Sequence, residues 1–344
     1  MEKNRLDILK EKIQENFTWV ILLILVLIFA ISSRNFLSIA NIINLLNANA
    51  YVLVVAIGVT FLMLSGAMDL SVGYIMSSCG VLCAILMENY NVSAGIAIIV
   101  GVALAIMLSL LNTFLSQLLR LSVLIVTLGT MTIYQGISYL VSQSKVIKLT
   151  SEAYRFIGQG KVLAIGGYEG VPFPIILAAI LFIVMDIFLK KTYTGRYIYA
   201  LGGNEEATRL AGIKVKWIRY LIAIIAGIFI GLSAIMLHAR MGSSQSAYGP
   251  GTEFTVITAI LLGGVSINGG KGKLTGVLAG VLIMAIFANG MQLAGIQQNY
   301  QYIAKGSILL IALGFDVFQT IRHEKSLIKK KTEMAAERFA RIRK

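Results

Sequence analysis

The residues that could carry out chemistry are few, and their spacing forms no catalytic set. The chain has two histidines, His238 and His323, and neither a zinc site nor a Ser–His–Asp set can be assembled around them. A nucleotide-binding loop requires the pattern G-x-x-x-x-G-K-S/T. The nearest run, residues 264–272, has the wrong spacing and places Gly272 where Ser or Thr is needed. We therefore expect no catalytic residue, no metal and no cofactor in this chain, and we set a membrane-embedded enzyme aside.

The clearest chemical pattern lies in a polar segment, residues 190–219, between two long apolar runs. Asn204 can accept a hydrogen bond from the first free N–H groups of a helix. Glu205 and Glu206 follow it and place negative charge at the positive end of the helix dipole. Glu205 and Arg209 are spaced i, i+4, so we expect an ion pair between them. This order of residues predicts that a helix begins after Asn204.

The same segment indicates where this short helix is bounded. Gly202 and Gly203 precede it and are expected to loosen the chain. Gly212 can adopt the left-handed conformation that often ends a helix. A helix over residues 204–212 is too short to be stable alone in water. We therefore expect that a partner outside the membrane holds it.

The composition places the surrounding elements in a lipid bilayer. Hydrophobic residues make up 57% of the 344 residues and charged residues 13%, whereas soluble domains have about 25% charged residues. Continuous apolar runs in a bilayer predict helices, because no water is present to bond an open backbone. We predict an all-α integral membrane protein with about ten transmembrane helices. The expected spans are residues 17–33, 48–66, 73–88, 93–112, 122–141, 173–189, 217–237, 253–267, 274–292 and 301–320.

The charges are distributed as a membrane topology requires. With the N-terminal segment, residues 1–16, in the cytoplasm, most of the 30 Lys and Arg fall on the cytoplasmic side. We therefore expect both termini in the cytoplasm and the transmembrane domain, residues 17–320, in a bacterial cytoplasmic membrane. The basic tail, residues 321–344, is expected to lie on anionic lipid. Topology accounts for the net charge of +14, so we expect no nucleic-acid partner.

Two Gly- and Ser-rich breaks, residues 65–73 and 263–272, each follow an apolar run. The span before the second break is short, which suits a broken or re-entrant helix, and the two breaks suggest related halves. Asp69 is expected to cap the helix after the first break. The residues expected to shape the breaks are Gly66, Asp69, Ser71, Gly73, Gly263, Gly264, Gly269 and Gly270.

Polar residues inside the apolar runs have two interpretations. They can bond neighbouring helices, or they can line a pathway that accepts the hydroxyl groups of a solute. An asparagine cluster near the outer end of the second span leaves both open: Asn41, Asn44, Asn47 and Asn49. We name Asn47, Thr60 and Asn289 as candidate pathway residues. No series of Asp, Glu or His crosses the expected spans, which argues against ion-coupled transport.

Other features predict local structure only. Asp186 precedes Lys190 by four residues, so we expect a local ion pair. Two outer segments, residues 142–171 and 238–252, are either docking surfaces or plain connectors. Cys79 and Cys83 are expected to be packed side chains without a disulfide. Glycines spaced i, i+4 predict close helix contacts at two places, namely Gly227 with Gly231 and Gly276 with Gly280.

Three segments, residues 65–73, 193–213 and 259–272, resemble the membrane permease subunit of ribose-type ABC importers. The resemblance covers about residues 15–320 and implies the permease fold of that family. It implies that residues 204–212 form the coupling helix, seated in a cleft of an ATPase that binds ATP and Mg. It also implies a second permease subunit and an extracytoplasmic sugar-binding protein as partners.

We therefore expect a transport subunit that moves a monosaccharide, ribose- or galactose-like, by alternating access. An alternative is the same architecture importing a nucleoside or a polyol. A stand-alone channel or an ion-coupled carrier is the alternative from another class, and it predicts transport without an ATPase. The sequence leaves open which sugar is carried and whether the second permease subunit is identical.

Overall fold

The computed structural model describes residues 17–163, 170–314 and 316–318. The N-terminal segment 1–16, the basic tail 321–344 and His323 lie outside the described residues. Its helices are α2 (Phe17–Ser32), α3 (Ile39–Leu64), α4 (Val72–Glu88), α5 (Ala94–Leu119), α6 (Val123–Ser142), α7 (Glu152–Gln159), α8 (Phe173–Lys191), α9 (Tyr193–Gly203), α10 (Glu205–Leu210), α11 (Val215–Met241), α12 (Thr252–Leu262), α13 (Leu274–Leu293) and a last helix, Gln298–Phe318. Two antiparallel two-residue pairs accompany them: β1 (Ile147–Lys148) with β4 (Ser243–Ser244), and β2 (Lys161–Val162) with β3 (Val171–Pro172).

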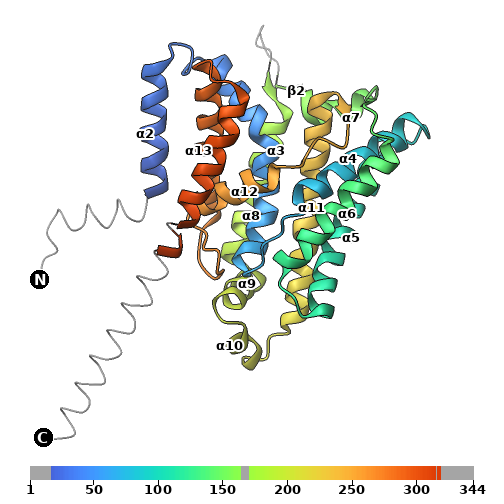
Figure 1. Cartoon of the computed structure of the whole chain (residues 1–344), viewed down its shortest axis with the longest axis vertical. Coiled ribbons are helices and arrows are strands. Elements are labelled where there is room, and N and C mark those ends of the chain that lie inside the picture. The colour runs from blue at the N-terminus through green and yellow to red at the C-terminus, as the bar shows by residue number, and fades with distance from the viewer. Residues whose placement is uncertain (1–16, 164–169, 315, 319–344) are drawn as a thin grey trace, which may run out of the picture.

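The described helices form one membrane-type bundle (Figure 1). Among the described residues, seven helices are long and apolar enough to cross a bilayer: α3, α5, α6, α8, α11, α13 and Gln298–Phe318. Three further apolar helices are shorter, namely α2, α4 and α12. At 1.5 Å per residue, the 11 residues of α12 cover about half of a hydrocarbon core of about 30 Å. The predicted eighth span is therefore a half-helix.

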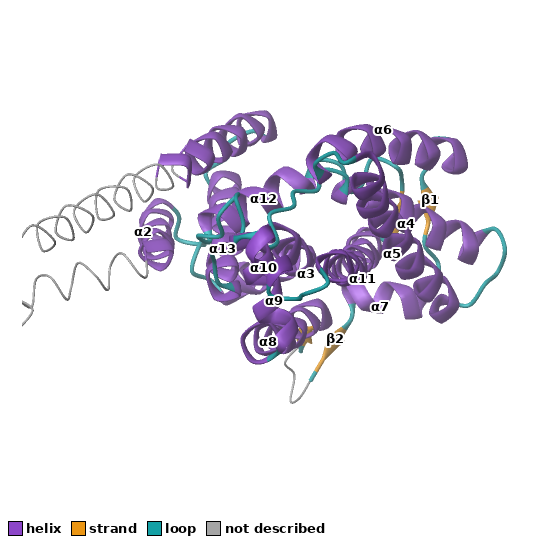
Figure 2. Cartoon of the chain, turned by 90° about the horizontal axis from the view of Figure 1, so that it is seen from below, coloured by secondary structure: helices purple, strands orange, loops and turns teal. Residues whose placement is uncertain are grey.

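Helix α11 lies at the centre of the bundle, between α3, α4 and α5 (Figure 2). A Cβ on Gly227 would meet the backbone of Ile106 in α5, and one on Gly231 would meet Val102 Cα at 2.9 Å. A Cβ on Gly276 in α13 would meet the backbone of Gly263, just after α12, and one on Gly280 would meet the backbone of Ala259 in α12. Small residues thus let these helix backbones approach closely, which confirms both predicted glycine contacts. Cys79 and Cys83 are buried free thiols, as predicted.

The structure has helix at three places where the sequence predicted none. Helix α3 begins at Ile39 and not near residue 48, because Ser38 caps it by accepting a hydrogen bond from the Asn41 N–H at 3.3 Å. Residues 142–171, predicted to be an outer segment, contain α7, whose Tyr154 is fully buried against the bundle, so the segment is more than a connector. The polar segment 190–219 contains a second helix, α9, before the predicted one.

Buried hydrogen bonds inside the bundle stabilise the first break, residues 65–73. Asp69 is 2% exposed, and its Oδ1 accepts hydrogen bonds from the Ser71 N–H at 2.7 Å and the Ser71 Oγ at 2.6 Å. Asn112 of α5 donates to Ser71 Oγ at 2.8 Å. Asp69 therefore bonds the residue that precedes α4 and does not cap the first turn of α4, in contrast to the prediction. The carboxylate fixes the turn that feeds α4 into the membrane.

Candidate functional site

Helix α10 has both of its predicted caps. Asn204 Oδ1 accepts a hydrogen bond from the Ala207 N–H at 2.9 Å. Gly212 has a φ of 80°. Its N–H donates to the Arg209 carbonyl at 3.0 Å, and the Ile213 N–H donates to the Thr208 carbonyl at 3.4 Å. This pair of bonds satisfies carbonyls that a helix end leaves free. The caps confirm the predicted local structure of this segment.

The ion pairs of α10 differ from the prediction. Glu205 pairs with Arg219 of α11 at 2.5 Å and not with Arg209. Arg209 instead lies 4.0 Å from Glu206, three residues earlier. Glu205 sits at the first turn, where the chain folds back toward α11, so the long Arg219 side chain reaches it directly. The pair ties α10 to α11, although exposed pairs contribute only about 0–1 kcal/mol.

One face of α10 is free for a partner. The Glu206 side chain is 77% exposed, and Leu210 is 80% exposed. Thr208 is buried on the opposite face and donates its hydroxyl to the Asn204 carbonyl at 2.7 Å. Figure 1 shows α10 projecting below the bundle, beyond the ends of the long helices. The helix thus combines a bundle-facing side with an open side that carries both charge and an apolar side chain.

The end of α9 contacts both Gly- and Ser-rich breaks, residues 65–73 and 263–272. The Gly270 N–H donates to the Leu64 carbonyl at 2.8 Å, which joins the second break to the end of α3. A Cβ on Gly202 would clash with that Leu64 oxygen and would lie 2.5 Å from Gly270 N. A Cβ on Gly269 would lie 2.6 Å from Gly66 N. We call this contact of residues 64–66, 202–203 and 269–270 the glycine junction. We predicted that Gly202 loosens the chain, and this was wrong. Gly202 lies in the last turn of α9, in close contact with two other segments.

Other break residues also have positions that demand glycine. Positive φ values occur at Gly66, Gly264, Gly269 and Gly270, with values of 81°, 80°, 80° and 70°. Gly263 and Gly73 are needed for space: a Cβ on Gly263 would meet the backbone of Gly276, and one on Gly73 would meet the backbone of Gly249. Tyr199 of α9 donates its hydroxyl to the Gly272 carbonyl at 2.9 Å and adds a second tie to the second break. The structure thus brings Gly66, Gly269 and Gly270 together with the end of α9, whereas Gly73 lies against Gly249.

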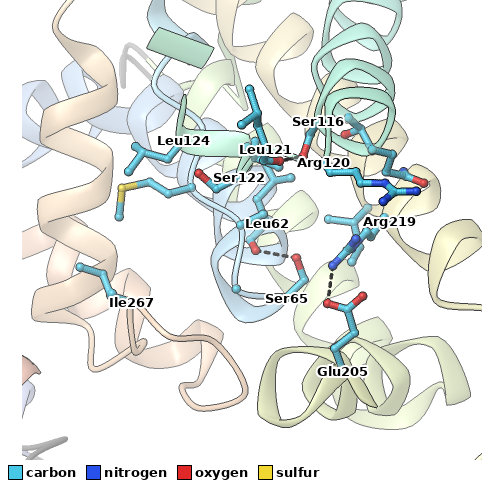
Figure 3. A pocket seen from close by; sticks show the side chains of 17 residues that line it. Leu62, Ser65, Ser116, Arg120, Leu121, Ser122, Leu124, Glu205, Arg219 and Ile267 are labelled. Carbon is cyan, nitrogen blue, oxygen red and sulfur yellow. Dashed lines mark hydrogen bonds and ion pairs between the residues drawn. The ribbon is translucent and has the colours of Figure 1, made fainter. Parts of the chain in front are cut away.

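A cavity of about 740 Å³ adjoins the glycine junction on the side of α10. Glu205 and Arg219 point toward one another at its edge, and Arg120 lies nearby (Figure 3). Its remaining wall comes from the first break, the end of α5, the start of α6 and Ile267. A second cavity, of about 580 Å³, lies at the opposite end of α11, between Met241, α12 and the last helix.

The three candidate pathway residues do not lie together. Thr60 is fully buried and donates its hydroxyl to the Ala56 carbonyl of its own helix at 2.6 Å. Asn289 exchanges two hydrogen bonds with Asn41, at 2.9 and 3.0 Å, which joins α13 to α3. Asn47 is half-buried, and its Oδ1 has no partner among the described residues. None of the three belongs to the described walls of the two cavities.

The residues that line the second cavity were missed by sequence reasoning. Tyr248 comes from the segment between α11 and α12, which was predicted to be an outer segment, and Tyr302 and Lys305 come from the last helix. The sequence did indicate Lys305, because an ionisable residue within an apolar span is a default candidate for a functional residue. The predicted Asp186–Lys190 ion pair is present at 2.6 Å.

Comparison with known proteins gives consistent matches over most of the chain. A family model described as the permease component of the branched-chain amino acid transport system matches residues 41–313. The ribose import permease protein of Bacillus subtilis is 36% identical, covering 86% of this chain and 90% of its own length. The ribose import permease protein of Escherichia coli K12 is 32% identical, covering 89% and 95%. The L-arabinose transport system permease protein of Escherichia coli K12 is 36% identical, covering 87% and 89%. No solved structure matches the chain. The chain belongs to the permease family whose model spans residues 41–313.

Proposed function

We propose that this permease is the membrane subunit of an ATP-driven importer for a ribose-like monosaccharide. The observation that carries the proposal is the glycine junction. A capped helix with an open outer face is tied through α9 to both breaks in the transmembrane bundle. The similarity to ribose and L-arabinose permeases supports a monosaccharide as the solute. The branched-chain amino acid in the family description makes an amino acid the solute to test against.

In this proposal α10 is the coupling helix and α9 transmits its motion. Displacing α10 moves Gly202, and the backbone contacts of Gly202 leave no free space before Leu64 and Gly270 also move. Leu64 ends α3, and Gly270 lies in the break between α12 and α13. A rigid close contact passes a displacement on instead of absorbing it. Movement of α10 is therefore expected to shift α3 and α12 relative to the rest of the bundle.

The two cavities suit alternating access. One lies beside Arg219 and Ile222 near the start of α11, and the other lies beside Leu237 and Met241 near its end. The segments between the cavities, including the middle of α3 and of α12, are buried and apolar. A shift of α3 and α12 would open one cavity while it closes the other. This arrangement requires only a few weak contacts with the solute, since the solute must also leave.

The proposal includes partners and an orientation. An ATPase that binds ATP and Mg seats α10, a second permease subunit completes the pathway, and an extracytoplasmic binding protein delivers the sugar. This places α10, both termini and the glycine junction on the cytoplasmic side. The distribution of Lys and Arg supports that orientation.

Uptake by the assembled complex tests the proposal. The chain is purified with its ATPase and binding-protein partners and placed in liposomes, and uptake of radiolabelled ribose, L-arabinose, galactose, adenosine and leucine is measured with and without ATP. We expect ATP-dependent uptake of one of the monosaccharides and none of leucine. Leucine or adenosine uptake would overturn the assigned solute. Sugar uptake by the chain alone, without the ATPase, would overturn the coupled mechanism in favour of a channel.

A further inference from the structure

The segment between α11 and α12 is non-helical and consists mostly of turns and bends, with only Ser243–Ser244 extended. The chain leaves α11 at Met241 and enters α12 at Thr252, and α12 covers only about half of the hydrocarbon core. The intervening residues must therefore cover part of the remaining distance, and Figure 1 shows α12 at about the mid-height of the bundle. Non-helical backbone at this depth is stable only where protein buries it or where it lines a water-filled cavity. Residues 242–251 meet both conditions, because one side is bonded to the bundle and the other borders the second cavity.

The buried side of this segment is fixed by a serine cluster. Ser246 Oγ lies 2.9 Å from both Ser138 Oγ and Ser142 Oγ of α6. The Ser246 carbonyl accepts hydrogen bonds from Ser77 Oγ of α4 at 2.9 Å and from Gln135 Nε2 at 3.1 Å. The four serines of this cluster are all less than 5% exposed. These bonds satisfy the inserted backbone and hold it in one conformation.

The cavity side of the segment presents ordered aromatic and hydroxyl groups. Tyr248 is held by its hydroxyl, 3.2 Å from Ser243 Oγ, and by the His238 ring, whose centroid lies 5.5 Å away in an edge-on contact. Glu253 accepts the Gly251 N–H with both carboxylate oxygens at 3.0 Å, which fixes the start of α12. Tyr51, Tyr302, Thr255 and Thr258 complete this part of the wall. Aromatic faces with a few placed polar groups are typical of small-molecule sites.

Lys305 is the one charged residue among the described residues that line this cavity. It is half-buried within the last helix, and no described Asp or Glu forms an ion pair with it. Glu253, in the first turn of α12, is 2% exposed and accepts the Gly251 N–H with its carboxylate. The cavity therefore holds a cation without a paired anion. A positive charge near low-dielectric walls repels other cations and attracts anions and electron-rich oxygens.

We propose that this cavity is an aqueous chamber that admits neutral and anionic solutes and excludes cations, and that Lys305 is the residue responsible. The inference rests on the proposed function only in making this the chamber through which the sugar passes. A neutral sugar can place hydroxyl oxygens against the ammonium group and its ring against the tyrosines. A cation-excluding chamber would also limit leakage of inorganic cations when the pathway opens.

Charge-selective thiol labelling tests this proposal on the full-length chain in membranes. Ala247 is exposed and lines the cavity, so Ala247→Cys provides a small reporter there. Ser93→Cys, at an exposed position before α5, provides a reporter outside the cavity. The two native cysteines are buried, so the wild-type chain gives the background. Each reporter is labelled with an anionic sulfonatoethyl and a cationic trimethylammonioethyl methanethiosulfonate, and the ratio of anionic to cationic rates is measured.

The ratio of anionic to cationic labelling rates is expected to be higher at Ala247→Cys than at Ser93→Cys. When Lys305→Gln is added to Ala247→Cys, the ratio should fall about five- to tenfold, because one charge then no longer acts on two reagents of opposite sign in a hydrated site. Lys305→Arg should keep the ratio, and Lys145→Gln, which removes an exposed charge elsewhere, should not change it. An unchanged ratio in Lys305→Gln, or an Ala247→Cys thiol that neither reagent labels, would overturn the proposal. The labelling requires no ATPase and no sugar, so a failure of the uptake experiment would be a separate result.

Discussion

Replacing Gly202 by alanine should weaken the glycine junction, whereas the same change at Gly203 should not. The two glycines are neighbours in the last turn of α9, with Gly202 half-buried and Gly203 exposed. A Cβ on Gly202 would lie 2.5 Å from Gly270 N and closer still to the Leu64 oxygen. A Cβ on Gly203 would meet no atom within 4 Å. Gly203→Ala is therefore a matched control.

The cost of Gly202→Ala follows from these distances. Real Cβ atoms essentially never lie closer than 3.0 Å to a neighbouring atom, so α9 must move away from Leu64 and Gly270. Overfilling a close contact of this kind costs about 1–3 kcal/mol. Losing the bond from Gly270 N–H to the Leu64 carbonyl adds about 1 kcal/mol. We expect a total of about 2–4 kcal/mol for Gly202→Ala and no loss for Gly203→Ala, where alanine favours the helix.

Two measurements on the assembled complex separate stability from coupling. The first is the melting temperature of the purified permease, and the second is the number of sugar molecules imported per ATP hydrolysed. Gly202→Ala should lower this transport ratio at least tenfold while the ATPase partner still binds, because the link from α10 to α3 is loosened. Gly203→Ala should match the wild type in both measurements. Equal transport ratios for the two variants would refute the proposed role of the junction.

Two further predictions concern single contacts. Glu206→Lys should abolish uptake, because it reverses the charge on the open face of α10 that the ATPase is proposed to hold. It should not affect membrane insertion, because this 77% exposed side chain loses only a 4.0 Å contact with Arg209. Wild-type uptake by the immunopurified complex would contradict this. Asn289→Ala should lower the melting temperature through loss of about 1 kcal/mol of bonding to Asn41, with sugar selectivity unchanged; altered selectivity at an unchanged melting temperature would restore Asn289 to the pathway.

Local signals predicted the short helix well. Asn204 and Gly212 act through bonds to residues three to five positions away, so their roles depend on sequence spacing alone. The prediction of a Glu205–Arg209 pair was wrong because the true partner of Glu205 is distant in sequence. That partner, Arg219, is 14 residues away and becomes available only when the chain folds back into α11. The transmembrane helices were predictable because long apolar runs in lipid have few alternatives.

The glycine junction and the second cavity could not be predicted in the same way. Gly202, Gly66 and Gly269 each resemble ordinary flexible glycines in sequence, and only the fold reveals that Gly269 lies against the backbone of the other two. Thr60 and Asn289 were chosen as polar residues in apolar runs. The Thr60 hydroxyl bonds a carbonyl one turn earlier in its own helix, whereas the bonds between Asn289 and Asn41 depend on which helix α13 meets. Lys305 was detectable by type, but its cavity depends on the fold of residues 242–251.

Cross-linking from the open face of α10 tests the central claim most directly. Leu210→Cys places a thiol at a side chain that is 80% exposed, and a short bismaleimide is applied to inside-out vesicles that contain the complete complex. A covalent adduct between this residue and the ATPase subunit is the result we predict. Labelling of Leu210→Cys by a membrane-impermeant maleimide added outside intact cells, with no such adduct, would contradict the account.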